Sequence, residues 1–187
     1  PSITREEFFK YKFDVEYSRE SILAGVRNRY IKEMEGEEIS DDLLPGFELI
    51  KNWNLRADSL NTSAALAILT LPNAFKPENL KYDRDSITVK LGENMSYLKK
   101  QYGKIDVPLG RVFRLVRGAT SLPLSGGPGT LRAIYSKKSG KIYKAVAGDC
   151  YIQAVEWGPE GQLNAWSIHQ YGSSTMDKTS PHFDDQS

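Results

Sequence analysis

The sequence contains a single cysteine, Cys150, and only two histidines, His169 and His182. A single cysteine excludes a disulfide bond within the chain. These three residues are scattered along the sequence and do not show the ligand spacing of structural zinc sites. We therefore predict neither a disulfide-stabilised fold nor a metal site, and nothing in the sequence indicates a cofactor.

The chain also lacks an excess of charge of either sign. It has 25 Lys and Arg residues against 24 Asp and Glu residues, a formal net charge of +1. Domains that bind nucleic acid usually carry a clear basic excess, so the composition gives no electrostatic case for such a partner. No apolar run approaches the roughly 18 residues of a membrane span, and no secretory signal opens the chain. We expect an ordinary globular protein that binds neither nucleic acid nor membrane.

The first hundred residues show the patterns of helices. Thr4 and Glu7 fit a capping box, in which each side chain accepts a hydrogen bond from the other residue's amide. We expect Ser18 to cap a second helix with apolar positions every four residues and Gly36 as its stop. These apolar positions are Ile22, Val26, Tyr30 and Met34.

Three further helices are expected in this half. A short one follows Pro45, and another covers residues 64–71 and ends before Pro72. The last has an apolar stripe that closes at Gly103. The stripe consists of Ile87, Leu91, Met95, Leu98 and Tyr102. Core packing is the simplest interpretation of every stripe.

From about Ile105 the apolar period changes from 3.6 to 2. Residues 112–116 are β-prone, and Leu131, Ala133 and Tyr135 alternate before a turn at Ser139-Gly140. Residues 151–157 and 162–171 flank Gly158-Pro159-Glu160-Gly161, which indicates a hairpin. We predict an α+β protein, with a helical segment over residues 1–106. An antiparallel β segment of four or more strands, with a docking tail at its end, covers residues 107–187.

The most glycine-rich stretch is residues 124–129, Leu-Ser-Gly-Gly-Pro-Gly. Glycines permit positive φ and close backbone approach, so a phosphate-binding loop is conceivable. The stretch lacks the Lys-Ser/Thr of a P-loop and the spacing of a dinucleotide fingerprint. We interpret it as a structural turn between strands.

Cys150 could form a thiolate pair with His169 or His182, with Asp149 or Asp184 orienting the imidazole. The sequence alone does not bring these groups together, and the charge of Asp149 disfavours a thiolate beside it. We expect Cys150 to be a reduced, packed thiol without a nucleophilic role. Rapid alkylation at neutral pH would contradict that expectation.

Two terminal features offer weaker alternatives. Residues 181–185, Pro-His-Phe-Asp-Asp, have the composition of a metal-binding tail, although a solvated or docking loop explains one histidine and two carboxylates as well. Pro1 is a secondary amine that could act as a general base, as in the tautomerase family. Because those chains are short βαβ units, a processing boundary is the better explanation of Pro1.

Several segments resemble, in this order, the penicillin acylase family of N-terminal nucleophile hydrolases. They are Phe8, residues 12–14 and 53–58 in the helical part, and residues 109–118, 122–128 and 148–149 in the β-rich part. Residues 171–174, 180–182 and 185–186 resemble the closing motif. Within the family, the chain looks most similar to acylases of acyl-homoserine lactones and aculeacin.

The resemblance implies a precursor that cuts itself into an α chain and a β chain. The new N-terminal serine of the β chain attacks an amide carbonyl, and its own α-amino group serves as the base. The chain would be a late part of the β chain, a fragment of a larger αββα fold, in a periplasmic or extracellular parent enzyme. Its partners would be the α chain and the rest of the β chain, with a small acyl amide as the substrate of the intact enzyme.

The chain departs from the family pattern where chemistry is concerned. No residue matches the nucleophile, the oxyanion-hole asparagine or the calcium ligands, and Cys150 stands where family members often have serine. We therefore assign no catalytic, cofactor-binding or metal-binding residue and expect the chain alone to be inactive. Strand edges cut from a larger sheet would make it prone to self-association. The alternative is a stand-alone α+β module that binds a sugar or peptide through its ten tyrosines and three tryptophans.

Overall fold

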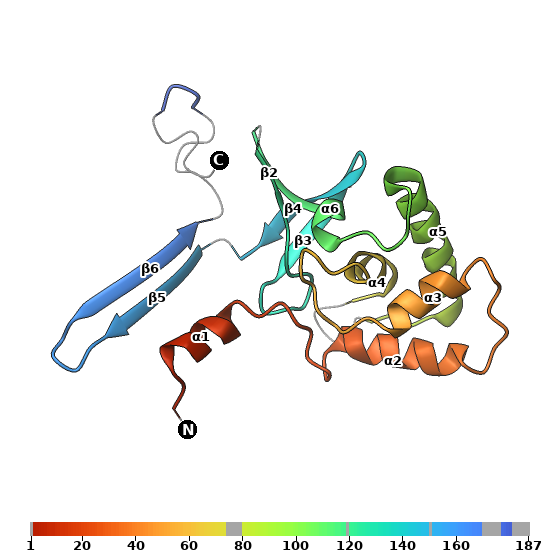
Figure 1. The fold of residues 1–187 in the computed structure, drawn as a ribbon, viewed down its shortest axis with the longest axis horizontal. Helices are drawn as coiled ribbons and strands as arrows, with labels where there is room; N and C mark the ends of the chain where they lie inside the picture. Colours follow the sequence, from red (N-terminus) through yellow and green to blue (C-terminus); the bar gives the residue numbers. More distant parts are fainter. Residues whose placement is uncertain (1, 74–79, 119, 150, 170–176, 181–187) are drawn as a thin grey trace.

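The computed structural model describes residues 2–73, 80–118, 120–149, 151–169 and 177–180. These residues form an α+β fold, with helices first along the chain and strands after them (Figure 1). The helices are α1 (Arg5–Lys12), α2 (Ile22–Met34), α3 (Leu44–Lys51), α4 (Ala64–Thr70), α5 (Arg84–Tyr102) and α6 (Leu109–Val112). The strands are β1 (Phe113–Arg117), β2 (Thr120–Pro123), β3 (Ile134–Ser139), β4 (Ile142–Gly148), β5 (Tyr151–Trp157) and β6 (Leu163–His169).

Local signals place most helices where the sequence predicts them. The capping box of α1 is confirmed, because the Glu7 amide donates to the Thr4 hydroxyl over 3.1 Å and the Thr4 amide to the Glu7 carboxylate over 2.8 Å. Helix α5 buries its predicted apolar stripe up to Leu98. Gly103 ends α5 with a φ of 80°, a left-handed conformation that glycine adopts at low cost.

The predicted cap of the second helix is wrong by three residues. The side chain of Ser21, and not that of Ser18, accepts the hydrogen bond from the amide of Ala24 at the start of α2. Ser18 instead closes a turn before the helix: its hydroxyl accepts from the Glu20 amide and its carbonyl from the Ser21 amide. Both serines are good caps. Ser18 is already used by this turn, so the helix begins at Ile22.

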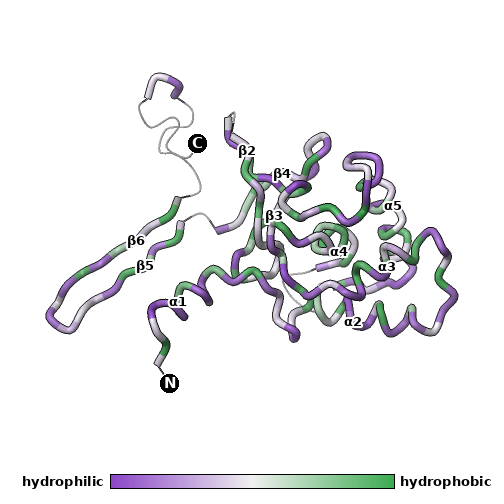
Figure 2. The backbone as a smooth tube through the Cα atoms, viewed as in Figure 1, coloured by the Kyte–Doolittle hydropathy of each residue, from purple (hydrophilic) through white to green (hydrophobic). Residues whose placement is uncertain are grey.

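The main hydrophobic core joins the helices to the start of the β-rich half. It lies between α2, α3, α4 and α5, and Figure 2 shows the apolar α4 near the middle of this part of the molecule. Val107, Leu109 and Val112, which follow the helical segment in sequence, are fully buried in the same core. In the described part of the chain, no helix combines the length and apolar character needed to cross a membrane.

The larger sheet has four strands in the order β2-β1-β4-β3. The β1–β2 and β3–β4 pairs are antiparallel, whereas β1 and β4 run parallel, with Phe113 opposite Tyr143. The prediction of an antiparallel β segment is therefore wrong for this pair, and the sheet is mixed. The β1–β2 and β3–β4 hairpins join through β1 and β4. Whether β1 and β4 run parallel or antiparallel depends on the path of the loop between β2 and β3. Residue alternation within a strand carries no information about that relative direction.

The boundaries of the first strands also differ from the sequence prediction. Val112 closes the short helix α6 and β1 begins at Phe113, while β3 begins at Ile134, so Leu131 and Ala133 precede it. The predicted turns are confirmed: Ser139 and Gly140 lie at the β3–β4 connection, and residues 158–161 connect β5 and β6.

Strands β5 and β6 form a separate two-stranded sheet that projects from the rest of the molecule (Figure 1). Its contacts with α1 include the Arg5 guanidinium 4.3 Å from the ring of Trp166, and the Phe9 ring edge-on to Trp166 at 5.9 Å. Hydrophobic segments continue along the hairpin (Figure 2). Its exposed large apolar residues are Tyr151, Val155, Trp157, Leu163, Trp166 and Ile168. An isolated hairpin is marginally stable in water, so this element is expected to need further packing.

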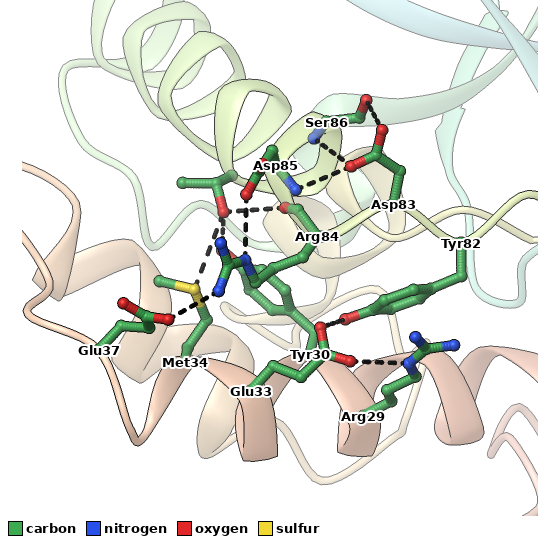
Figure 3. Close-up of polar contacts among 11 residues, drawn as sticks. Arg29, Tyr30, Glu33, Met34, Glu37, Tyr82, Asp83, Arg84, Asp85 and Ser86 are labelled. Carbon is green, nitrogen blue, oxygen red and sulfur yellow. Dashed lines mark hydrogen bonds and ion pairs between the residues drawn. The ribbon is translucent and has the colours of Figure 1, made fainter.

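A polar network ties α2 to the start of α5 (Figure 3). The carboxylate of Glu33 accepts hydrogen bonds from Arg29 at 2.9 Å and from the hydroxyl of Tyr82 at 2.8 Å. Burial, followed by the neighbouring Glu33, raises the pKa of Tyr82 to about 12. Arg84 bridges to Glu37 over 2.9 Å. These groups pair with one another within α2 or between the α2 region and the start of α5, so we interpret the network as structural.

The N-cap of α5 gives a pH-dependent prediction. The carboxylate of Asp83 accepts from the amides of Ser86 and Asp85, and these bonds, that of Ser86 first, lower its pKa from 3.8 (Figure 3). A lowered folded-state pKa stabilises the fold above pH 3.8, and that stabilisation disappears as the pH falls through the folded value. Asp83→Asn keeps the cap but loses the charge. We expect wild type to melt slightly above Asp83→Asn at about pH 7 and the two melting temperatures to converge near pH 2; a constant difference would contradict the assignment.

Candidate functional site

Segments far apart in the sequence meet at one place, which we call the glycine-loop junction. It consists of residues 15–17, 55–59, 109–110 and 125–127, which lie where the helices meet the larger sheet. The Tyr17 amide donates to the Leu55 carbonyl and the Ala57 amide to the Val15 carbonyl, both over 2.9 Å. The first pairing brings the chain after α1 alongside the chain after α3.

The glycine loop docks onto the same strand-like pair. The Gly126 amide donates to the Ala57 carbonyl over 2.7 Å, and the hydroxyl of Ser125 accepts from the Ser59 amide over 3.0 Å. The Ser59 carbonyl in turn accepts from Gly110 at 2.8 Å. Four of the segments that carry the family resemblance therefore lie at this junction or beside it. Residues 53–58, 109–118 and 122–128 contribute to the junction. Residues 148–149 lie beside it, because Asp149 pairs with Arg132.

The turn at residues 53–58 is held in an uncommon conformation. Leu55 has a φ of 62°, a left-handed value that is rare for a residue with a Cβ, and the indole of Trp53 donates to the Arg56 carbonyl over 3.0 Å. Trp53 is 2% exposed and packs edge-on against the ring of Tyr17 at 5.6 Å. The strained residue positions the carbonyl that accepts the hydrogen bond from Tyr17.

The glycine loop connects β2 to β3, as a structural turn would. The Gly126 amide donates to the Ala57 carbonyl, and the Gly127 amide donates to the hydroxyl of Thr130 over 3.1 Å. Thr130 is buried, and its hydroxyl also lies 3.0 Å from the Gly127 carbonyl and 2.9 Å from that of Arg132. These loop amides point into the protein, whereas a phosphate-binding loop directs its amides at the ligand.

Arg132 and Asp149 form a half-buried ion pair beside the junction. The Arg132 Nε lies 3.7 Å from the Asp149 carboxylate, and the guanidinium lies 5.3 Å from the ring of Phe13. The amide of Asp149 donates to the Ala133 carbonyl over 3.1 Å. This pair anchors the end of β4 to the loop before β3. Asp149, which the sequence offered as an orienting group for a histidine, thus faces an arginine.

Sequence reasoning missed a pocket of about 290 Å³ beside the junction. Its walls are the start of α2, the end of the glycine loop and β3. The lining residues are Tyr17, Ser21, Ile22, Leu23, Asn73, Pro128, Gly129 and Tyr135. Because the walls come from five separate stretches, no local signal in the sequence could reveal it.

The other residues proposed from the sequence are not brought together in the described structure. Cys150, His182, Asp184, Pro1 and residues 171–174, 181 and 185–186 lie outside the described residues. His169 ends β6, where it is opposite Tyr151 in the ladder. Within the described stretches, no three side chains of His, Cys, Asp or Glu gather in a way that could hold a metal ion.

Comparisons with known proteins provide no assignment: the sequence matches no protein-family model and none of the curated proteins.

Proposed function

We propose that this chain is a late β-chain part of an amide-hydrolysing acylase of the penicillin acylase type, in which it serves as scaffold. The proposal rests on the order of the family-like segments. The observation that carries it is the placement of four of these segments at or beside the glycine-loop junction. Segments that are similar because they build one junction would be expected to meet in this way.

The projecting hairpin gives independent support. Trp157 is 71% exposed and Leu163 61% exposed, and both lie on a two-stranded sheet that contacts α1 through Arg5 and Phe9. Large exposed apolar patches often mark surfaces that bind another protein. In an intact acylase, the α chain and the earlier part of the β chain would supply that cover. The parent enzyme would act in the periplasm or outside the cell, by resemblance.

The proposed chemistry belongs to the parent enzyme. Catalysis of this type needs a free N-terminal Ser, Thr or Cys whose α-amine is the base. The junction provides hydrogen bonds between backbone groups and a packed turn, which hold a structure together and prepare no nucleophile. The substrate would be an N-acyl amide, an acyl-homoserine lactone or a β-lactam side chain, with its acyl pocket formed by other parts of the enzyme.

The test compares the chain with the longest reading frame that contains it. We expect the 187-residue chain to hydrolyse none of the three substrate classes above buffer. The full reading frame should cleave itself, expose a serine and hydrolyse at least one of them. Replacing that serine by alanine is the matched control and should abolish both reactions.

Two results would overturn the proposal. Turnover by the chain alone that Cys150→Ala or His169→Ala abolishes would reveal an active site within it. A full reading frame that neither cleaves itself nor acts on any of these amides would remove the acylase assignment. The second candidate, a binding module for a sugar or peptide, would then remain. It is favoured by the exposed aromatic side chains of Tyr11, Tyr151 and Trp157 on α1 and the hairpin.

A further inference from the structure

The near-zero net charge of the chain conceals an uneven distribution of charge. Residues 107–148, which include α6 and the whole four-stranded sheet, contain eight Lys and Arg residues and no Asp or Glu. The other residues carry 17 Lys and Arg against all 24 Asp and Glu. A basic surface attracts anionic partners locally, within about a Debye length, whatever the net charge of the chain. The larger sheet is therefore the basic part of an otherwise acidic protein.

Three of these cations lie in one row across the sheet, on the neighbouring strands β1, β4 and β3 (Figure 1). Lys144 on β4 is opposite Lys137 on β3 and in register with Arg114 on β1. Residues opposite each other in a ladder point to the same face, and like charges in such positions are destabilising. Lysine on an edge strand guards against unwanted strand pairing, which accounts for Lys137 but not for Lys144 on a central strand.

The charge of this row is not neutralised within the described residues. The carboxylate nearest in sequence, that of Asp149, pairs with Arg132, and no ion pair in the described part of the chain includes a cation of the row. The Arg114 guanidinium donates to the Ser121 hydroxyl over 3.0 Å and to the Gly110 carbonyl over 2.9 Å. These neutral acceptors hold the guanidinium in place but leave its charge uncompensated.

Helix α5 covers the opposite face of the sheet, where the rings of Tyr143 and Tyr97 lie 5.9 Å apart. The face that carries the row, which we call the basic face, also bears aliphatic side chains. Side chains two residues apart point to the same side of a strand, which places Val116, Ile142 and Val146 beside the cations. Val146 is 49% exposed. The basic face thus combines uncompensated cations with accessible apolar surface.

This combination is typical of a surface that binds a membrane peripherally. Ammonium and guanidinium groups are attracted to the phosphates of anionic lipids, while aliphatic side chains enter the boundary between headgroups and acyl chains. Proteins that bind single-stranded nucleic acid usually stack its bases on aromatic side chains. The described positions of the basic face include no aromatic residue, so lipid suits this face better.

We propose that the basic face binds the surface of an anionic phospholipid membrane without crossing it. Each Lys or Arg near such a surface strengthens binding about fivefold. With Lys141 in the adjacent β3–β4 turn as a fourth cation, the expected Kd is on the order of 1 mM accessible anionic lipid. The absence of net charge, on which the expectation of no membrane partner rested, does not describe this face. The proposal is independent of the acylase assignment, because all of its groups lie within the described residues.

The experiment is co-sedimentation of the 187-residue chain with phosphatidylcholine vesicles that contain about half phosphatidylglycerol. We expect half of the chain to sediment at about 1 mM accessible phosphatidylglycerol in about 0.1 M salt, and to be released in about 0.5 M salt, because salt screens surface charges. Vesicles of phosphatidylcholine alone should not bind. Soluble glycerol phosphate at the lipid concentration should not displace the chain. Displacement by it would mean that the face binds free phosphate and would overturn the proposal.

The matched variants are the double substitutions Lys137→Gln/Lys144→Gln on the basic face and Lys10→Gln/Lys12→Gln on α1, which remove the same charge. The first should weaken vesicle binding at least tenfold, and the second by no more than about twofold. Lys137→Gln/Lys144→Gln should melt no lower than wild type, because it removes a pair of like charges, so unfolding would not explain the loss. If this variant nevertheless does not fold, Lys137→Gln alone should show a loss of about fivefold.

Three results would overturn the proposal. Equal weakening by the two double variants would show that only the overall charge matters. Equal binding to uncharged vesicles would point to adsorption through the apolar hairpin. Tighter binding of a single-stranded oligonucleotide than of the vesicles, through the same two lysines, would make nucleic acid the partner.

Discussion

Gly126→Ala is expected to destabilise the protein by about 2–5 kcal/mol and lower its melting temperature by roughly 5–20 °C. Gly126 has a φ of 97°, and a Cβ at this position would lie 2.2 Å from the backbone oxygen of Arg132. The left-handed conformation costs a residue with a Cβ about 1–2 kcal/mol, and the overlap adds about 1–3 kcal/mol. The obstructing atom belongs to the backbone of a loop fixed by Thr130, so it cannot move aside as a flexible side chain would.

Gly103→Ala separates the cost of the left-handed conformation from the cost of the steric overlap. Gly103 has a φ of 80° at the end of α5, but a Cβ there would meet nothing within 4 Å. This variant should therefore lose only about 1–2 kcal/mol, the conformational cost alone. Urea unfolding of both variants measures the difference. If the two variants lose equal stability, the close contact between Gly126 and Arg132 does not constrain the junction.

Trp53→Ala is the second substitution with a large expected effect. Trp53 is 2% exposed, packs against Tyr17 and donates from its indole to the Arg56 carbonyl. Truncating a buried tryptophan to alanine costs about 3–5 kcal/mol, because apolar contacts are lost and a cavity remains. The loss also leaves the Arg56 carbonyl without its indole donor, so the turn with the positive φ at Leu55 should loosen.

Trp157→Ala is the control of the same residue type. Trp157 is 71% exposed on the hairpin, and surface substitutions usually change stability by about 0.5 kcal/mol or less. Denaturant unfolding at low protein concentration keeps any self-association through the hairpin from disguising the comparison. A loss below about 1 kcal/mol for Trp53→Ala would show that the turn at residues 53–58 does not belong to the cooperative core.

Gly126→Ala and Trp53→Ala test neighbouring parts of the structure around the glycine-loop junction. Gly126 lies on the glycine loop and Trp53 precedes the chain segment on which that loop docks, so both should disturb the Ala57–Gly126 hydrogen bond. Residues that share partners are not expected to have additive effects. The double variant should therefore lose less stability than the two single losses together.

The positions of elements followed from local interactions that a sequence shows directly. Thr4 caps α1 and Gly103 ends α5, because a cap depends on groups within a few residues of each other. The stripe up to Leu98 identified the buried face of α5, since 3.6-residue spacing places those side chains on one side. The hairpin at residues 158–161 followed from its turn residues in the same way.

Tertiary structure decided everything that depends on residues distant in sequence. It set β1 parallel to β4 across two hairpins. It also buried the hydroxyl of Tyr17 behind the glycine loop and formed a pocket from five separate stretches. Local patterns record which face of an element is apolar. Which surfaces then meet is set by packing over the whole chain, and the candidate binding site is a product of that packing.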